Sequence, residues 1–150
     1  MMETRDILLV EDDTNDIELT LTALEEYNLA NRVVIARDGA EALDYLYRRG
    51  AYAARPANHP VIVLLDLQMP KVDGLEVLRQ VKSDPALKII PVVVLTSSDQ
   101  EQDIVESYDL GVNAYVVKPV AFDKFVEAVK QLCLFWVLTN EPPPDALQSR

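Results

Sequence analysis

The sequence predicts a doubly wound α/β domain, in which helices cover both faces of a five-stranded parallel sheet. Short runs rich in Val, Ile or Leu alternate five times with segments whose apolar residues have helical spacing. The runs lack strict polar alternation, which is typical of strands buried on both faces. The chain has 150 residues, 49% of them hydrophobic, which is enough for one domain with a substantial core.

Five strands are expected, each a run of four or five apolar residues. They are Ile7–Val10, Val33–Ala36, Val61–Leu65, Val92–Leu95 and Ala114–Val117. Strands that alternate with helices are parallel and are joined by right-handed crossovers. Their carboxyl ends therefore lie at one edge of the sheet, where ligands bind in folds of this kind.

Five helices are expected after these strands, each with apolar residues three or four positions apart. Asp13 or Thr14 can cap the first helix and Asp38 the second, and Gly111 can end the fourth. The residues expected to face inward are Ile17, Leu21 and Leu24 in the first helix; Leu43, Leu46 and Tyr47 in the second; Gly74, Val77, Leu78 and Val81 in the third; Ile104, Val105 and Tyr108 in the fourth; and Phe122, Phe125, Val126, Val129, Leu132, Cys133 and Trp136 in the fifth.

Composition and charge disfavour several classes of partner and several kinds of site. The net charge of -11 and the pI of about 4.4 disfavour contact with nucleic-acid phosphates, so no nucleic-acid partner is expected. The single cysteine cannot form an internal disulfide, and the single histidine, His59, is expected in a surface loop. The amino terminus does not resemble a secretory signal and no apolar run is long enough to span a bilayer, which predicts a cytoplasmic protein without a membrane partner.

Charged and hydroxyl side chains follow four of the five predicted strands. Glu11 and Asp12 follow the first strand, and Asp66 follows the third. Thr96 follows the fourth strand and Lys118 the fifth. Crowded carboxylates raise each other's pKa, and a divalent cation relieves that repulsion. Because the ligands are hard oxygen atoms, the sequence predicts a Mg²⁺ site at this edge.

The same residues suit phosphoryl chemistry. We expect Asp12 and Asp66 to ligate Mg²⁺ directly. Glu11 is expected to act mostly through water, and the backbone carbonyl of Gln68 to complete the protein's share. Asp66 is the best candidate nucleophile because a carboxylate that directly follows a buried strand can form an acyl phosphate. Lys118 can neutralise the transferring oxygens.

Thr96 and Asp13 are expected to have roles other than metal binding. The hydroxyl of Thr96 can donate to a third phosphoryl oxygen. Asp13, although it adjoins the acidic pair, is better explained as an acidic residue at a helix N-terminus, where the macrodipole favours negative charge.

These residues resemble the motifs of response regulator receiver domains. The matching runs are Ile7–Asp13, Val63–Pro70 with Asp73 and Gly74, Val94–Ser97 and Tyr115–Pro119, and the resemblance spans about residues 5–130. It implies a flavodoxin-like fold with strand order 2-1-3-4-5 and phosphorylation of Asp66 by a sensor histidine kinase with Mg²⁺. It also implies a cis Lys118–Pro119 bond, and a switch in which Thr96 moves toward the phosphoryl group and Tyr115 turns inward.

Two features resemble the small single-domain regulators that partner bacterial and cyanobacterial phytochromes. They are the long connection 48–60 and the ending 134–138 with its proline-containing tail. This resemblance implies a receiver domain over residues 1–139, a tail over 140–150, and a bacteriophytochrome kinase as partner. It also implies a homodimer through the fourth helix, fifth strand and fifth helix. In support, an exposed apolar patch is expected from Leu134, Phe135, Val137 and Leu138.

Three alternative functions fit less well. A flavin- or nucleotide-binding domain needs a Gly-rich or hydroxyl-rich loop after the first strand, where the acidic run 11–13 would repel phosphate. An aspartyl phosphatase places a second catalytic aspartate where this chain has Gln68, so the protein is not expected to be an enzyme acting on external substrates. A receiver-like module that is never phosphorylated usually loses the acceptor, the acidic pair or the lysine, and this chain has them all.

Overall fold

A computed structural model describes residues 5–69 and 71–143, and its sheet has the predicted topology. All five strands are parallel, in the order β2-β1-β3-β4-β5. The strands are Ile7–Val10 (β1), Val33–Ala36 (β2), Ile62–Leu65 (β3), Val92–Thr96 (β4) and Ala114–Val117 (β5). The predicted fold class and strand order are confirmed. The bounds differ by one residue only at the start of β3 and the end of β4.

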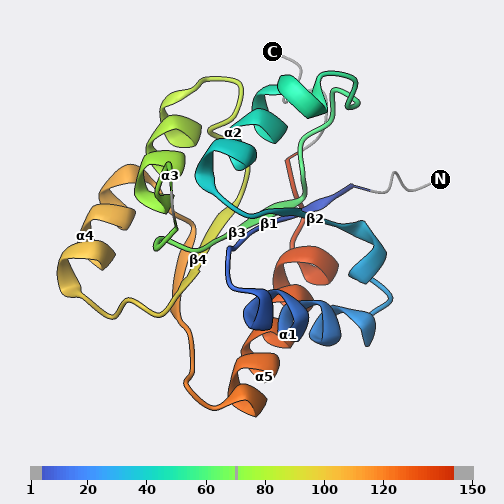
Figure 1. Ribbon diagram of the computed structural model, residues 1–150, viewed down its shortest axis with the longest axis vertical. Coiled ribbons are helices and arrows are strands. Elements are labelled where there is room, and N and C mark those ends of the chain that lie inside the picture. The colour runs from blue at the N-terminus through green and yellow to red at the C-terminus, as the bar shows by residue number, and fades with distance from the viewer. Residues whose placement is uncertain (1–4, 70, 144–150) are drawn as a thin grey trace.

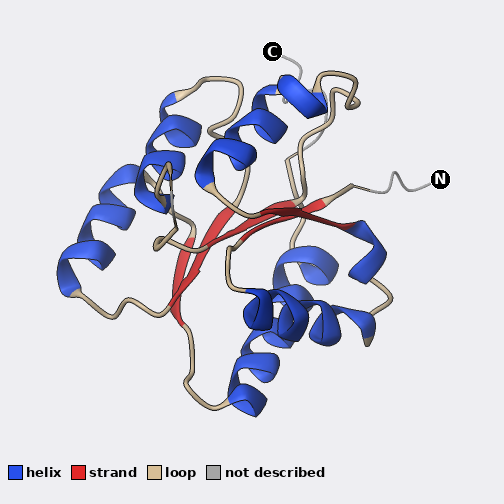
Figure 2. Cartoon of the chain, in the orientation of Figure 1, coloured by secondary structure: helices blue, strands red, loops and turns tan. Residues whose placement is uncertain are grey.

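Helices cover both faces of the sheet. The α-helices are Thr14–Glu25 (α1), Gly39–Tyr47 (α2), Gly74–Ser83 (α3), Glu101–Leu110 (α4) and Phe122–Cys133 (α5), with 3₁₀ helices Ala30–Arg32 (η1) and Gly50–Tyr52 (η2) and a π-helical segment Leu134–Thr139 (η3). Helices α1 and α5 lie on one face, and α2, α3 and α4 on the other, as Figures 1 and 2 show. Residues 140–143 continue without helix, and the rest of the predicted tail, 144–150, lies outside the described residues.

Aspartate side chains explain where three helices begin. Asp13, Asp38 and Asp73 each accept the backbone N–H three residues further on, at 3.0, 2.8 and 3.0 Å. These bonds satisfy amides that would otherwise have no partner in the first helical turn. Asp13, one of the two residues predicted to cap α1, is therefore its N-cap. At the carboxyl end of α4, Gly111 adopts a left-handed φ of 105°. This conformation favours glycine and ends the helix.

Strand side chains alternate between two buried clusters, one beneath each helical layer. Leu8 and Val10 of β1 pack with α2 and α3, whereas Ile7 and Leu9 pack with α1 and α5. The central strands β1, β3 and β4 are buried at every position. The edge strands β2 and β5 are mostly half-buried, so the expectation of strands buried on both faces was wrong for them. The helices cover the middle of the sheet more fully than its edges.

The predicted inward face of α4 was wrong for two of its three residues, since only Ile104 is partly buried. Val105 and Tyr108 are 52% and 54% exposed, and the fully buried side chain of this helix is Ser107. Phe122, at the start of α5, is also 68% exposed. Helical spacing reveals an apolar stripe, but it does not reveal whether another element covers that stripe.

The single histidine was wrongly expected at the surface. His59 is 8% exposed, and its Nε2 lies 2.8 Å from the carbonyl oxygen of Ala86. The Arg5 side chain donates to the carbonyl oxygens of His59, Pro60 and Pro143 at 3.2 to 3.3 Å. The connection before β3 is therefore packed against the amino end of the chain, because a buried guanidinium satisfies its carbonyl groups.

Candidate functional site

The carboxyl edge of the sheet brings together side chains that are far apart in the sequence. Val10, the last residue of β1, pairs with Leu65, the last of β3, and the Asp66 N–H donates to the Val10 carbonyl at 3.0 Å. The Lys118 N–H donates to the Thr96 carbonyl at 2.7 Å. The residues that follow β1 and β3 therefore begin at the same level of the sheet, whereas Lys118 begins two residues beyond that level, because Leu65 pairs with Val94 and Val117 pairs with Thr96.

Three carboxylates form a compact cluster at this edge. Glu11, Asp12 and Asp66 each offer one oxygen, and these oxygens lie within 4.8 Å of one another. Glu11 and Asp66 are 3% and 6% exposed, whereas Asp12 is exposed. Oxygen-only donors at this spacing suit a hard divalent cation. The structure therefore contains the acidic metal-binding triad that the sequence predicted.

Burial raises the pKa of Glu11 to about 7. The hydrogen bond from Lys118 lowers this pKa, but the charge of Asp66 raises it further. The ammonium of Lys118 thus does not fully offset the burial of Glu11 and the nearby charge of Asp66. A bound cation would favour the ionised form of Glu11, so the electrostatics of the cluster also fit a metal ion.

Lys118 supplies the positive charge of the cluster. Its Nζ lies 2.6 Å from Glu11 Oε1, 2.7 Å from Asp16 Oδ2 and 3.2 Å from Asp66 Oδ2, and its side chain is 8% exposed. Burial alone would lower the pKa of Lys118, but the hydrogen bonds to Asp16 and Glu11 and the charge of Asp66 outweigh it and raise the pKa above its ordinary value. Lys118 is therefore charged, and its three N–H donors each have a carboxylate acceptor.

Asp16 belongs to this cluster, although it was not among the site residues predicted from the sequence. It lies in the first turn of α1, where its backbone N–H donates to the Asp13 side chain. One signal was present in the sequence. A helix that starts directly after a strand carries its first turn beside the strand ends, and this helix has an acid there.

Ser98 connects the two predicted switch residues. Thr96 is fully buried, and its Oγ1 accepts the Ser98 N–H at 3.4 Å. The Tyr115 hydroxyl donates to the Ser98 carbonyl at 2.9 Å. The Ser98 hydroxyl in turn donates to Asp103 Oδ2 in α4 at 2.6 Å. Tyr115 is half-buried against the core under α3, so its hydroxyl is held by the loop before α4.

The loop after Asp66 closes tightly on α3. The Gln68 N–H donates to Asp66 Oδ1 at 3.2 Å, and the Gln68 side chain accepts from Ser97 at 3.1 Å. A Cβ at Gly74 would lie 2.3 Å from the Asp66 carbonyl oxygen. Gly74 was predicted as a member of the inward face of α3, but its position requires glycine because the backbone of Asp66 is so close.

The resemblance implied a cis bond between Lys118 and Pro119, and this expectation was wrong. The bond is trans in this structure. The trans form is the lower-energy isomer of a bond before proline, and the Lys118 N–H still reaches the Thr96 carbonyl.

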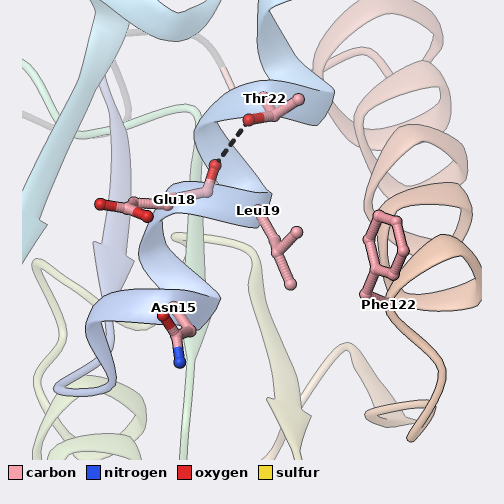
Figure 3. Close-up of a pocket in the computed structure, with 5 residues that line it drawn as sticks. All are labelled: Asn15, Glu18, Leu19, Thr22 and Phe122. Carbon is pink, nitrogen blue, oxygen red and sulfur yellow. Dashed lines mark hydrogen bonds between the residues drawn. The ribbon is translucent and has the colours of Figure 1, made fainter.

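A groove of about 480 Å³ lies between α1 and the start of α5. Figure 3 shows Leu19 and Phe122 facing each other across it. The lining residues are Asn15, Glu18, Leu19, Thr22 and Phe122. None of them belongs to the acidic cluster, so the groove is distinct from the candidate metal site.

The order of the strands and the residues at their ends agree with a known family. The family model for the response regulator receiver domain matches residues 7–130. The chain belongs to the response regulator receiver family. It is therefore a signalling domain of a two-component system, and its Glu11, Asp12 and Asp66 cluster is consistent with the phosphoacceptor site of such domains.

Individual relatives and their solved structures indicate which kind of receiver the chain resembles. The receiver is 41% identical over 137 residues to response regulator Rcp1 of Synechocystis sp., covering 91% of this chain and 92% of Rcp1. The Mn²⁺-bound crystal structure of Rcp1 matches with a TM-score of 0.88 and 40% identity, over 93% of this chain and 99% of that chain.

Two phytochrome response regulators give further matches. The phosphorylated cyanobacterial regulator RcpA has a TM-score of 0.89 and 45% identity, over 95% of this chain and 100% of that chain. The bacteriophytochrome response regulator AtBRR has a TM-score of 0.73 and 62% identity, over 93% of this chain and 100% of that chain. The predicted resemblance to phytochrome-partner regulators is confirmed. Among the residues that the structure describes, no helix is long and apolar enough to cross a membrane.

Proposed function

We propose that Asp66 accepts a phosphoryl group from a sensor histidine kinase and that the receiver then changes the surface formed by α4, β5 and α5. The position of Asp66 carries this proposal. It is buried at the end of β3, with Oδ2 3.2 Å from the Lys118 ammonium and with two further carboxylates close by. Such a site combines a nucleophile with the positive charge that phosphoryl transfer needs.

The transfer is a displacement at phosphorus. An oxygen of the Asp66 carboxylate forms a bond to phosphorus, while the bond from phosphorus to the imidazole nitrogen of the kinase phosphohistidine breaks. The nitrogen keeps the electron pair, and because the other ring nitrogen of the phosphohistidine carries a proton in this step, the leaving group is neutral imidazole. Lys118 binds one phosphoryl oxygen and the Thr96 hydroxyl another, so the charge moved to Asp66 is stabilised by donors already at the strand ends.

The acidic triad would hold Mg²⁺. Asp12 and Asp66 are direct ligands in this proposal, Glu11 acts mostly through water, and the main-chain carbonyl of Gln68 completes the protein's share. Mg²⁺, when bound, supplies positive charge against the transferring phosphoryl oxygens. The spacing of the three carboxylates and the raised pKa of Glu11 support this assignment. The Mn²⁺-bound structure of Rcp1 is consistent with it.

In the proposed switch, Ser98 connects Thr96 to Tyr115 and to the start of α4. If Thr96 moves toward the phosphoryl group, the Ser98 N–H loses its acceptor, and the carbonyl that holds the Tyr115 hydroxyl shifts. The bond from Ser98 to Asp103 passes that shift to the first turn of α4. Thr96 and Tyr115 therefore act through one loop residue.

The proposed partners are a histidine kinase of the bacteriophytochrome type and a second copy of the chain. The similarity to RcpA and AtBRR supports the kinase. Exposed apolar side chains on or beside these elements support a homodimer through α4, β5 and α5, since exposed apolar surface often marks an interface. They are Val105 and Tyr108 of α4, Val117 of β5, and Leu134, Phe135 and Leu138 of the adjoining η3. Val137, predicted in this patch, instead packs against the cluster beneath α1 and α5.

Phosphorylation of the full chain tests the function. With Mg²⁺ and a small acyl phosphate, intact-protein mass spectrometry should show one added phosphoryl group. Asp66→Asn should abolish the addition, whereas Asp109→Asn, which removes an exposed carboxylate from α4, should leave it unchanged. If Asp66→Asn is labelled to the same extent as the parent, Asp66 is not the acceptor.

A further inference from the structure

The Lys118 ammonium donates hydrogen bonds to more carboxylates than the proposed phosphoryl transfer requires. Its ammonium has three N–H donors, and Glu11, Asp16 and Asp66 accept one each. The contacts to Glu11 and Asp16 are 2.6 and 2.7 Å, whereas the contact to Asp66 is 3.2 Å. The ammonium is thus drawn toward the other two carboxylates and away from the proposed acceptor.

The start of α1 explains why Asp16 is available to Lys118. Asp16 is the third residue of the helix, and a carboxylate there commonly returns to the N–H of the capping residue. Here Glu11 Oε2 accepts the Asp13 N–H at 3.1 Å instead. The Asp16 side chain is therefore released from capping and reaches Lys118, 102 residues away in the sequence.

Asp16 differs from the other two acceptors of Lys118 in one respect. Glu11 and Asp66 belong to the acidic triad and would keep a positive neighbour if a metal ion were bound. Asp16 lies outside that triad, and its side chain is 25% exposed, so water can replace the lysine as its partner. Of the three bonds, the one to Asp16 is the least costly to give up when a phosphoryl oxygen needs an N–H donor.

We infer that Asp16 is a positioning residue, which holds the Lys118 ammonium in the unphosphorylated receiver and competes for it with the phosphoryl group on Asp66. This inference rests on the proposed phosphorylation of Asp66. The competition favours the unphosphorylated state, because the bond to Asp16 must be lost when Lys118 turns to the phosphoryl group. Removing the Asp16 charge should therefore make phosphorylation more favourable and make the unmodified fold less stable.

The test is a titration of the full chain with a small acyl phosphate at saturating Mg²⁺, with the phosphorylated fraction read from intact mass. Asp16→Asn should lower the donor concentration for half-phosphorylation about tenfold, which is the low end for a hydrogen bond between charged groups. Asp16→Glu keeps the carboxylate and should remain near the parent. Glu18→Gln removes an exposed charge from the same helix and should change the value by no more than roughly twofold.

A stability measurement separates this role from a merely structural one. Asp16→Asn leaves the backbone bonds of residue 16 to Asp13 and Thr20 in place, so the variant should fold. Its free energy of unfolding should fall while its phosphorylation becomes easier. A structural role would lower stability without lowering the half-phosphorylation concentration.

The outcomes distinguish the two proposals. Labelling that still depends on Asp66, but that needs as much or more acyl phosphate in Asp16→Asn than in the parent, overturns the competition alone. A similar decrease in Glu18→Gln also overturns it, because the effect would then be general electrostatics. Labelling of Asp66→Asn would instead overturn the proposed acceptor.

Discussion

The raised pKa of Glu11 makes the stability of the metal-free receiver depend on pH. Burial moves this pKa from 4.5 to about 7 on folding. Because the folded-state pKa lies above the unfolded value, the associated stability is fully present below pH 4.5 and is lost as the pH rises through about 7. We therefore expect Glu11→Gln, which removes the charge but keeps an oxygen acceptor for Lys118, to stabilise the metal-free protein under mildly alkaline conditions.

The size of the Glu11 pKa shift determines how large this difference in the free energy of unfolding can be. A change from 4.5 to about 7 is worth up to about 3 kcal/mol, since each pKa unit corresponds to about 1.4 kcal/mol. After allowing for local relaxation, the free energy of unfolding of Glu11→Gln should exceed that of the parent by roughly 1–3 kcal/mol near pH 8. The difference should vanish near pH 4.5, where Glu11 is protonated in the folded protein.

Urea unfolding followed by circular dichroism, with a chelator present, measures this difference across the pH range. Glu18→Gln is the matched control, because it removes an exposed glutamate and should show no such pH dependence. At saturating Mg²⁺ the parent should instead be more stable than Glu11→Gln. Metal binding to the native state stabilises the parent, whereas the variant has lost a carboxylate of the metal site. A variant that is less stable than the parent near pH 8 without metal, or a difference that persists on acidification, would refute the reasoning.

Three further changes test other parts of the structure. Gly74→Ala should lower the free energy of unfolding by about 2 kcal/mol and slow acyl-phosphate labelling, because its Cβ would lie 2.3 Å from the Asp66 carbonyl oxygen; unchanged values would contradict that contact. Ser107→Ala should be neutral or stabilise by up to about 1 kcal/mol in urea unfolding, since this buried hydroxyl has no hydrogen-bond partner among the described residues, and a clear loss would count against it. Phe135→Glu should give a monomer in sedimentation equilibrium if the patch on η3 forms the dimer, whereas an unaffected dimer would place the interface elsewhere.

The strands were predictable because a buried parallel strand has a simple signature. Its side chains are apolar on both faces, and the runs at Ile7–Val10 and Val92–Thr96 show this without help from the rest of the chain. Once the strands were known, parallel topology alone brought Glu11, Asp66 and Lys118 to one edge of the sheet. Much of the candidate site was therefore available from local patterns and one rule about connections.

The sequence by itself thus determined the fold class, the cap of α2 at Asp38, the end of α4 at Gly111 and the set of charged groups at the strand ends, because these depend on spacing along the chain. Only the tertiary structure decided that Asp16 binds Lys118, that Ser98 joins Thr96 to Tyr115, and that His59 is buried. It also decided that α4 buries Ser107 and exposes its apolar residues. These features depend on which elements pack together and at what distance, and a pattern of residue types does not contain that information.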